Sequence, residues 1–229
     1  MKIGIVGAGA VGQTLAEALI AKGHDVVIGV REPGPEALAK DRGHAGTLGD
    51  WVRRTGGTVG SLADAAAHGD VILNVTAGHA SLDALTMAGA AHLHGKVLVD
   101  VANPLDFSQG MPPFLLPQYT GPTSLAEQIQ AAFPGTHVVK AFNTVAAAVM
   151  VNPALVPGDH DLFIAGNDAG AKAKVTDLAT GFGWHHIVDL GDIKGARATE
   201  ALLPIWLRLW AVTGAFTHNL HVAKAESQA

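Results

Sequence analysis

The chain has 229 residues, contains no cysteine and carries a formal net charge of -5 at pH 7. This length can bury one substantial core, so we predict a single domain over 1–229, with a core over 1–145 and a C-terminal elaboration over 146–229. The negative charge and the lack of a Lys/Arg cluster argue against a nucleic-acid partner, and the lack of cysteine excludes disulfides and thiolate metal sites.

The opening run MKIGIVG leads directly into a predicted strand. It lacks the apolar stretch and the cleavage site of a secretory signal, so we expect a cytoplasmic location. A later apolar segment, Ala201 to Phe216, is interrupted by Pro204 and Arg208 and is too short to cross a bilayer. We therefore expect no membrane partner.

Short β-rich runs alternate along the chain with longer Ala-rich segments. This alternation is typical of a parallel sheet with helices on both faces, and we expect six strands in the parallel core. The predicted strands are Lys2 to Val6, Asp25 to Val30, Thr58 to Val59, Val71 to Val75, Lys96 to Val101, His137 to Ala141, Asp161 to Ala165 and His186 to Asp189. The predicted helices lie near Ala10 to Lys22, Ser61 to His68, Ser81 to Ala90, Ser124 to Phe133, Ala169 to Phe182 and Ala198 to His221.

A glycine-rich loop joins the first strand to the first helix. Gly7 permits a tight turn, Gly9 lets the backbone approach a pyrophosphate, and Gly12 lets the helix pack on the strand. The predicted binding loop comprises Gly7, Ala8, Gly9, Ala10, Val11 and Gly12. This context favours a dinucleotide site over a purely structural turn. It predicts a Rossmann-type, doubly wound, mostly parallel α/β sheet with extra C-terminal strands and a long apolar helix.

The second strand ends in Val30 and Arg31, and Glu32 follows. An NAD site places a carboxylate near here for the ribose 2′-hydroxyl, whereas the guanidinium fork of Arg31 suits a 2′-phosphate. We therefore favour NADP(H), although Val30 supplies no hydroxyl, Glu32 could turn back to a ribose, and Arg31 could be an ordinary surface cation. Further positive charge could come from Lys40, Arg42, Arg53 or Arg54.

Polar residues follow three later strands of the predicted sheet, at the edge where such folds bind ligands. Amides and hydroxyls there can hold a nicotinamide carboxamide or an acceptor ring without any nucleophile, as suits hydride transfer. The ring-pocket candidates are Asn74, Asn103, Asn143 and Thr144, with Thr76 and Pro104 as further cofactor contacts. No single residue is predicted to be catalytic, and turn formation is the alternative for each.

A segment with five prolines, Pro104 to Thr123, has no regular period. A loop of this length in a compact domain is usually functional, and its apolar side chains could cover an acceptor ring or pack against a second subunit.

Several runs of the sequence carry a family resemblance. They are GIVGAGAVGQTLAEALIAKGHDVVIGVRE, VDVANPL, VVKAFNTV, FIAGND and RATE. The chain resembles the NADPH-dependent deazaflavin coenzyme reductases and is similar to the NADPH-binding domain of the six-transmembrane epithelial antigen of the prostate metalloreductases, from Lys2 to about Asn219. The resemblance implies hydride transfer between NADPH and a small-molecule acceptor, which would be a deazaflavin, FAD or FMN.

Two departures from the family pattern concern the predicted sites. Family members often place Ser or Thr where this chain has Val30, so the 2′-phosphate contact would depend on Arg31. Related deazaflavin reductases can carry His in the turn where this chain has Phe142 and Asn143, so Phe142 is either a platform for the acceptor ring or a core residue.

Two other functions fit the sequence. Lys140 and Asn143 form a Lys-x-x-Asn arrangement in which Lys140 could donate a proton to a carbonyl, as in a small hydroxyacid or imine dehydrogenase. A non-catalytic NADPH-binding redox sensor is the third hypothesis.

The C-terminal segment Ala198 to His221 is predicted as one apolar helix, suited to a deep core or to a homodimer interface. Arg197 and Glu200 have the spacing of a helix ion pair. Three histidine pairs, His92 and His94, His185 and His186, and His218 and His221, lack the further ligands of a metal site, and none is predicted.

Overall fold

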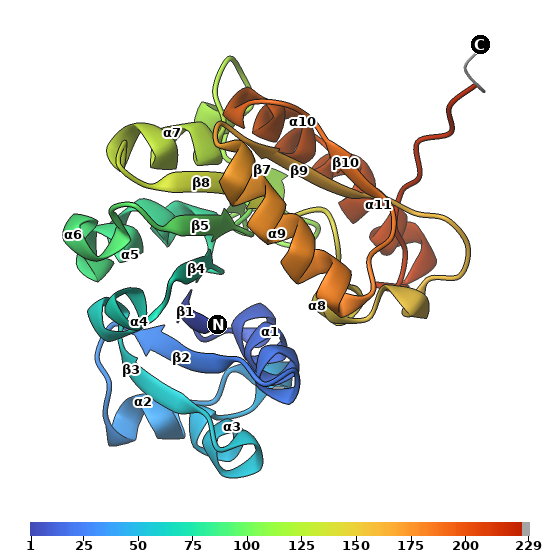
Figure 1. The fold of residues 1–229 in the computed structure, drawn as a ribbon. Helices are drawn as coiled ribbons and strands as arrows, with labels where there is room; N and C mark the ends of the chain where they lie inside the picture. The colour runs from blue at the N-terminus through green and yellow to red at the C-terminus, as the bar shows by residue number, and fades with distance from the viewer. Residues whose placement is uncertain (226–229) are drawn as a thin grey trace.

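The computed structural model describes residues 1–225, which contain one eight-stranded sheet and a small two-stranded hairpin (Figure 1). The strand order of the sheet is β10-β9-β8-β5-β4-β1-β2-β3. The strands are β1 (Lys2–Val6), β2 (Asp25–Val30), β3 (Thr58–Ser61), β4 (Val71–Asn74), β5 (Val97–Asp100), β8 (His137–Ala141), β9 (Leu162–Gly166) and β10 (Ile187–Asp189), with β6 (Leu105–Asp106) and β7 (Phe114–Leu115) in the hairpin.

Six neighbouring strands of the sheet, β3, β2, β1, β4, β5 and β8, run parallel, which confirms the predicted core. If these six strands are numbered in chain order, with β8 as the sixth, their order across the sheet is 3-2-1-4-5-6, which is that of the dinucleotide-binding fold. β9 pairs with β8 in the antiparallel direction, with Lys140 opposite Ala165, and β10 runs parallel to β9. The two extra C-terminal strands therefore extend the sheet beyond β8, as expected.

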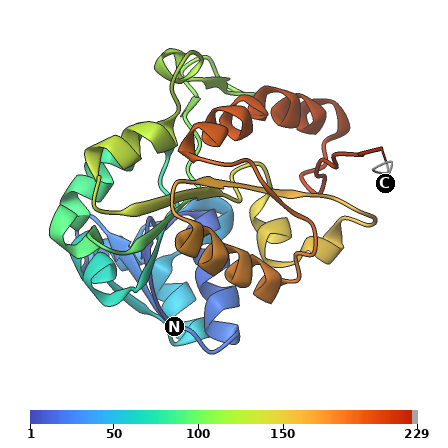
Figure 2. The same ribbon diagram turned by 45° about the horizontal axis from the view of Figure 1, so that its top comes forward.

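Helices cover both faces of the sheet (Figure 2). They are α1 (Ala10–Ala21), α2 (Pro35–Ala39), α3 (Leu48–Thr55), α4 (Leu62–His68), α5 (Ser81–Ala88), α6 (Ala90–Leu93), α7 (Leu125–Ala132), α8 (Ala147–Val151), α9 (Ala169–Phe182), α10 (Ala196–Ala201) and α11 (Leu203–Thr213). Short 3-10 turns lie at Gly43–Ala45, Gly78–Ala80, Pro117–Tyr119, Pro153–Leu155 and Ile193–Gly195.

Alternating strand residues divide the interior into two cores. In β5, Val97 and Val99 pack with α1, α3, α8 and α9, whereas Leu98 packs on the opposite face with α4, α5, α6 and α7. This division follows from the period of two in a strand, which sends successive side chains to opposite faces of the sheet.

The prediction of one long apolar helix over Ala198 to His221 is wrong. The helix is interrupted at Leu202, and Pro204 lies in the first turn of α11, where its missing N–H is tolerated. Gly214 then ends α11 in a left-handed conformation with φ +70°, so His218 and His221 do not share a helix face. None of the helices described for residues 1–225 is long and apolar enough to cross a membrane.

The sequence interpretation missed four short helices, α2, α3, α6 and α8. In α3, the Thr47 hydroxyl accepts a hydrogen bond from the Asp50 N–H at 3.0 Å, and Gly56 ends the helix at φ +69°. Trp51 is fully buried between these two ends. The cap and the glycine are visible in the sequence, and they would have located this helix.

Candidate functional site

A cavity of about 1050 Å³ opens at the carboxyl ends of β1, β2 and β4. Residues from all three strand exits line it, including Gly7, Gly9, Arg31 and Thr76. Ligands of doubly wound sheets bind at this edge, next to the point where the strand order reverses. The structure therefore brings the glycine loop and the second-strand exit together, as the sequence indicated.

The glycine loop has the geometry of an anion cradle. Gly7 adopts φ +120°, and a Cβ atom on Gly12 would lie 2.5 Å from the Gly7 carbonyl oxygen. Gly9 differs, because a Cβ there would meet no atom within 4 Å and its φ of -74° suits any residue. The protein itself does not require glycine at this position, so the open space fits a ligand that approaches the backbone.

The N-terminus of α1 supports the same interpretation. Gly9 is its N-cap residue and provides no side-chain hydrogen bond, and the first turn contains no acidic residue. The free amides and the positive end of the helix dipole thus have no internal anion to satisfy them. This helix end, together with the open face of Gly9, fits a pyrophosphate.

The predicted cations fall into two groups. Arg31, Lys40 and Arg42 line the cavity. Arg53 instead pairs with Asp50 in α3, and Arg54 pairs with Glu17 of α1 at 2.7 Å.

Two acidic side chains and a histidine also line the cavity. Glu32 and Glu36 lie on its lining, as does His79 from the turn after β4. His79 was not singled out from the sequence, where nothing distinguishes it from other exposed histidines.

Asn74 positions Thr76 instead of lining the cavity. The Asn74 side chain is fully buried, and its Nδ2 donates to Asp100 Oδ1 at 2.8 Å and to Ser81 Oγ at 3.2 Å. Its Oδ1 accepts the Thr76 hydroxyl at 2.7 Å. These bonds occupy both the N–H₂ group and the oxygen of the Asn74 side chain. The structure therefore gives Asn74 the role of orienting Thr76, which differs from the predicted ring contact.

A buried ionic cluster lies beneath this network. Lys140 Nζ lies 2.9 Å from Asp100 Oδ2 and 3.0 Å from Glu200 Oε1, and it also donates to the Ala102 carbonyl. Burial alone would lower the pKa of Lys140, but the attraction of Asp100 and Glu200 outweighs burial and raises the pKa. Lys140 does not line the cavity, and its three N–H groups are satisfied within the protein, so the geometry does not favour it as a proton donor to a substrate.

The predicted ion pair between Arg197 and Glu200 is absent. Glu200 accepts hydrogen bonds from the Leu125 and Ala126 amides at the start of α7, besides pairing with Lys140. Arg197 Nε donates to Glu127 at 2.8 Å, and this bond lowers the pKa of Glu127. Tertiary packing thus overrides the i, i+3 spacing, because helix α10 turns these side chains toward two different neighbours.

Asn103 and Asn143 join the exits of β5 and β8. Asn103 Nδ2 donates to the Asn143 carbonyl at 2.8 Å, and Asn143 Nδ2 donates to Asn103 Oδ1 at 3.1 Å. Asn143 Oδ1 is buried and has no hydrogen-bond donor among residues 1–225. Pro104 and Thr144, the neighbouring candidates, are buried as well.

Phe142 is a core residue. Its side chain is fully buried and meets Phe182 edge to face, with ring centroids 6.3 Å apart. Its backbone has φ +62°, a strained conformation for an aromatic residue that is typical of functional sites. The strained turn places Asn143 at the exit of β8.

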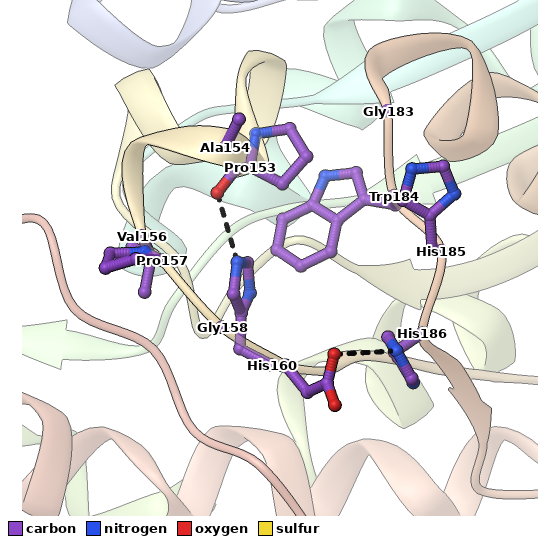
Figure 3. Close-up of a pocket in the computed structure, with 11 residues that line it drawn as sticks. Pro153, Ala154, Val156, Pro157, Gly158, His160, Gly183, Trp184, His185 and His186 are labelled. Atoms are coloured by element: carbon purple, nitrogen blue, oxygen red, sulfur yellow. Dashed lines mark hydrogen bonds and ion pairs between the residues drawn. The ribbon is translucent and has the colours of Figure 1, made fainter.

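A second, smaller cavity of about 350 Å³ lies between residues 153–160 and 183–186 (Figure 3). In it, His160 Nε2 lies 3.0 Å from the Pro153 carbonyl, and His186 lies 3.3 Å from Asp159. None of the predicted cofactor residues lines this cavity, and it has no glycine loop. Its geometry offers no dinucleotide cradle.

Comparisons with known proteins show which family this chain resembles. The family model described as NADP oxidoreductase coenzyme F420-dependent matches residues 2–104. The chain is 30% identical to the F420-dependent NADP reductase of Methanocaldococcus jannaschii over 216 residues, which cover 91% of this chain and 92% of that protein. It is 31% identical to Metalloreductase STEAP3 of Rattus norvegicus over 90% of this chain but only 38% of that protein. A crystal structure from Arthrobacter sp. FB24, provisionally named an F420-dependent NADP reductase, is similar with a TM-score of 0.92 and 46% identity, covering 98% of this chain and 100% of that one.

Proposed function

Because this chain belongs to the family of NADP oxidoreductases that depend on coenzyme F420, we propose that it transfers hydride between NADPH and a deazaflavin coenzyme, with FAD or FMN as alternative acceptors. The observation that carries this proposal is the cavity in which an open glycine loop faces three cations. NADPH, when bound, supplies the hydride, and the deazaflavin or flavin ring receives it.

In this proposal, the glycine loop holds the pyrophosphate through the free amides at the start of α1. Arg31, which follows Val30 at the exit of β2, provides charged donors for the 2′-phosphate. The proposed pyrophosphate loop consists of Gly7, Ala8, Gly9, Ala10, Val11 and Gly12.

Thr76 is suited to accept a hydrogen bond from a nicotinamide carboxamide. Its hydroxyl proton goes to Asn74 Oδ1 at 2.7 Å, so the 2.8 Å contact with Ser81 leaves Ser81 as the donor. A hydroxyl oxygen has two acceptor lone pairs, and the Ser81 hydroxyl occupies one of them. The other lone pair of Thr76, which lines the cavity, therefore remains available to a ligand. An acceptor there orients an amide N–H₂ group.

The exits of β5 and β8 are the proposed support for the reacting rings. Asn143 Oδ1, which is buried and lacks a donor among residues 1–225, would serve as a second acceptor if the bound ring reaches past the cavity lining, on which neither Asn103 nor Asn143 lies. The Asn103–Asn143 pair fixes its position. Pro104 and Thr144 would contribute shape, since both are buried beside this pair. The residues orient the rings and exclude water, so the reaction needs no nucleophile from the protein.

The experiment that tests the function measures anaerobic oxidation of NADPH and NADH with deazaflavin coenzyme, FAD and FMN. We expect deazaflavin to be the best acceptor and kcat/KM for NADPH to exceed that for NADH by at least about 10-fold, equivalent to about 1.4 kcal/mol. Turnover with NADH as efficient as with NADPH would contradict the choice of donor and point to Glu32 as a ribose ligand. Tight NADPH binding without turnover on any acceptor would contradict the enzyme proposal and favour a redox sensor.

We also propose that residues 1–145 and 146–229 act as one unit. Lys140 of the core pairs with Glu200 of the C-terminal part, and β8 pairs with β9. These contacts tie the proposed ring support to α10, so the two parts would not bind the acceptor separately.

A homodimer is the proposed assembly. Ile205 and Val212 of α11 are 51% and 60% exposed, and Phe114 of the adjoining hairpin is 62% exposed. Large apolar side chains on one exposed region are typical of an interface.

Light scattering should give the mass of a dimer for the wild type and the mass of a monomer for the double variant Ile205→Glu, Val212→Glu. Leu155→Glu, which changes an exposed residue on another element, is the control and should remain a dimer. A monomeric wild type at micromolar concentration would contradict this assembly.

A further inference from the structure

Three cations gather on the lining of the main cavity without an acidic partner. Within residues 1–225, Arg31, Lys40 and Arg42 form no ion pair, in a chain whose formal net charge is -5. By contrast, Arg53 and Arg54 of the neighbouring helix α3 are paired with Asp50 and Glu17. Acidic partners thus neutralise the two cations of α3, whereas the three cations on the cavity lining remain available to a ligand.

The local charge balance shows why Arg31 would be insufficient. Glu32 and Glu36 line the same cavity, so Arg31 alone would face two carboxylates and leave one net negative charge. A phosphate group carries about -1.5 to -2 charges at pH 7, and such a surface would repel it. With Lys40 and Arg42, three cations face the two carboxylates, and the net charge becomes positive.

Arg42 is held in place before any ligand arrives. Its side chain is half-buried, and Nη1 donates to the Lys40 carbonyl at 2.8 Å. The loop is fixed by a hydrogen bond from the Arg42 N–H to the Gly46 carbonyl at 3.1 Å and by a β-bridge between Asp41 and Thr47. Burial lowers the pKa of Arg42, yet a guanidinium remains charged at neutral pH, and its other N–H donors are left for a ligand.

We propose that Lys40 and Arg42 bind the 2′-phosphate of NADP(H) together with Arg31 and so determine the choice of NADP(H) over NAD(H). This inference rests on the proposed function, because it assigns further residues to the same donor site. Arg42 supplies positioned donors at low cost in conformational entropy, whereas the exposed Lys40 supplies mainly charge.

Titration calorimetry with two pairs of probes tests the assignment. 2′,5′-ADP and 5′-AMP differ only in the 2′-phosphate, as do NADP⁺ and NAD⁺. For the Arg42→Gln variant we expect about 10-fold weaker binding of 2′,5′-ADP, for Lys40→Gln about 3-fold, and for the double variant about 30-fold. Binding of 5′-AMP should be unchanged in all three, which also shows that they fold.

Two further variants give the reference and the control. Arg31→Gln should weaken 2′,5′-ADP binding at least as much as Arg42→Gln. Arg53→Gln removes the same charge from a site outside the cavity and should change neither probe. The effects at Lys40 and Arg42 should shrink as salt is added, because exposed charges are screened.

The outcomes separate this inference from the function on which it rests. If the wild type prefers 2′,5′-ADP, Arg31→Gln removes the preference, and both the Lys40 and Arg42 variants stay within 2-fold of the wild type, the assignment is overturned while the NADP donor stands. The assignment is also overturned if Arg53→Gln weakens 2′,5′-ADP binding as much as Arg42→Gln does, since the loss of any nearby cation would then have the same effect. If the wild type binds 2′,5′-ADP and 5′-AMP equally, the proposed donor itself is wrong.

Discussion

Replacing Lys140 by methionine is expected to lower the free energy of unfolding by about 3–5 kcal/mol, since this is the usual cost of removing one partner from a buried ion pair. The side chains of Lys140 and Asp100 are fully buried, and Glu200 is 1% exposed. The variant would leave two carboxylates close together without their cation. It would also release the Ala102 carbonyl, which Lys140 Nζ binds.

Urea denaturation measures this effect, and Lys172→Met is the matched control. Lys172 pairs with Asp189 at 2.7 Å, but half of the Asp189 side chain is exposed, so its loss should cost less than about 1 kcal/mol. A Lys140→Met variant within 1 kcal/mol of the wild type would show that the buried ion pairs contribute no more than an exposed pair, contrary to the geometry.

The pH dependence of the same difference has a defined sign. The pKa of Lys140 is raised in the folded state, so its stabilising contribution is complete below its unfolded pKa of about 10.4 and is lost as the pH rises through the folded value. The stability difference between the wild type and Lys140→Met should therefore be unaffected by the ionisation of Lys140 from pH 7 to about pH 9. If Lys140 instead donated a proton to the substrate, Lys140→Met would change the pH dependence of kcat.

The parallel core and the glycine loop could be predicted because their signals are local. β-branched runs, the Gly7 to Gly12 spacing and Arg31 at a strand end lie within a few dozen residues. The structure places Gly7, Gly9 and Arg31 on the lining of one cavity. Hydrophobic periodicity likewise located the six parallel strands.

The ionic cluster could not be predicted because its partners are distant in sequence. Asp100, Lys140 and Glu200 come from β5, β8 and α10, and no local pattern shows which cation meets which carboxylate. The spacing of Arg197 and Glu200 favoured a local pair, but Glu200 is drawn to Lys140 and to the amides of α7. Burial decides here, since an unpaired buried charge costs more than an exposed helix pair gains.

Asn74 shows the same limit at the site itself. Asn74 is the last residue of β4, at the strand exit that the sequence indicated, but Asp100, Ser81 and Thr76 occupy the hydrogen-bonding groups of its side-chain amide. A residue at a strand exit can either contact a ligand or hold the neighbour that does. Hydrogen-bond directions distinguish the two roles, and they are set by tertiary contacts that the sequence does not show.

Replacing Gly9 by alanine is expected to abolish most NADPH binding while leaving the fold intact. A Cβ at Gly9 meets no protein atom within 4 Å, and φ -74° with ψ -172° is an ordinary conformation for alanine. The unfolding free energy should change by less than about 1 kcal/mol, and reduced freedom of the unfolded chain could even raise it. The methyl group would nevertheless occupy the side from which a pyrophosphate approaches, so NADPH affinity should fall by about 10- to 100-fold.

Gly12→Ala separates binding from folding at the same loop. Its Cβ would lie 2.5 Å from the Gly7 carbonyl oxygen, so this variant should lose about 1–3 kcal/mol of stability through overpacking. Urea denaturation and calorimetric titration with NADPH on both variants give the two quantities. Should Gly9→Ala bind NADPH within 2-fold of the wild type, the pyrophosphate does not lie on this loop. If Gly9→Ala is instead as unstable as Gly12→Ala, then protein packing, and not a ligand, requires the glycine.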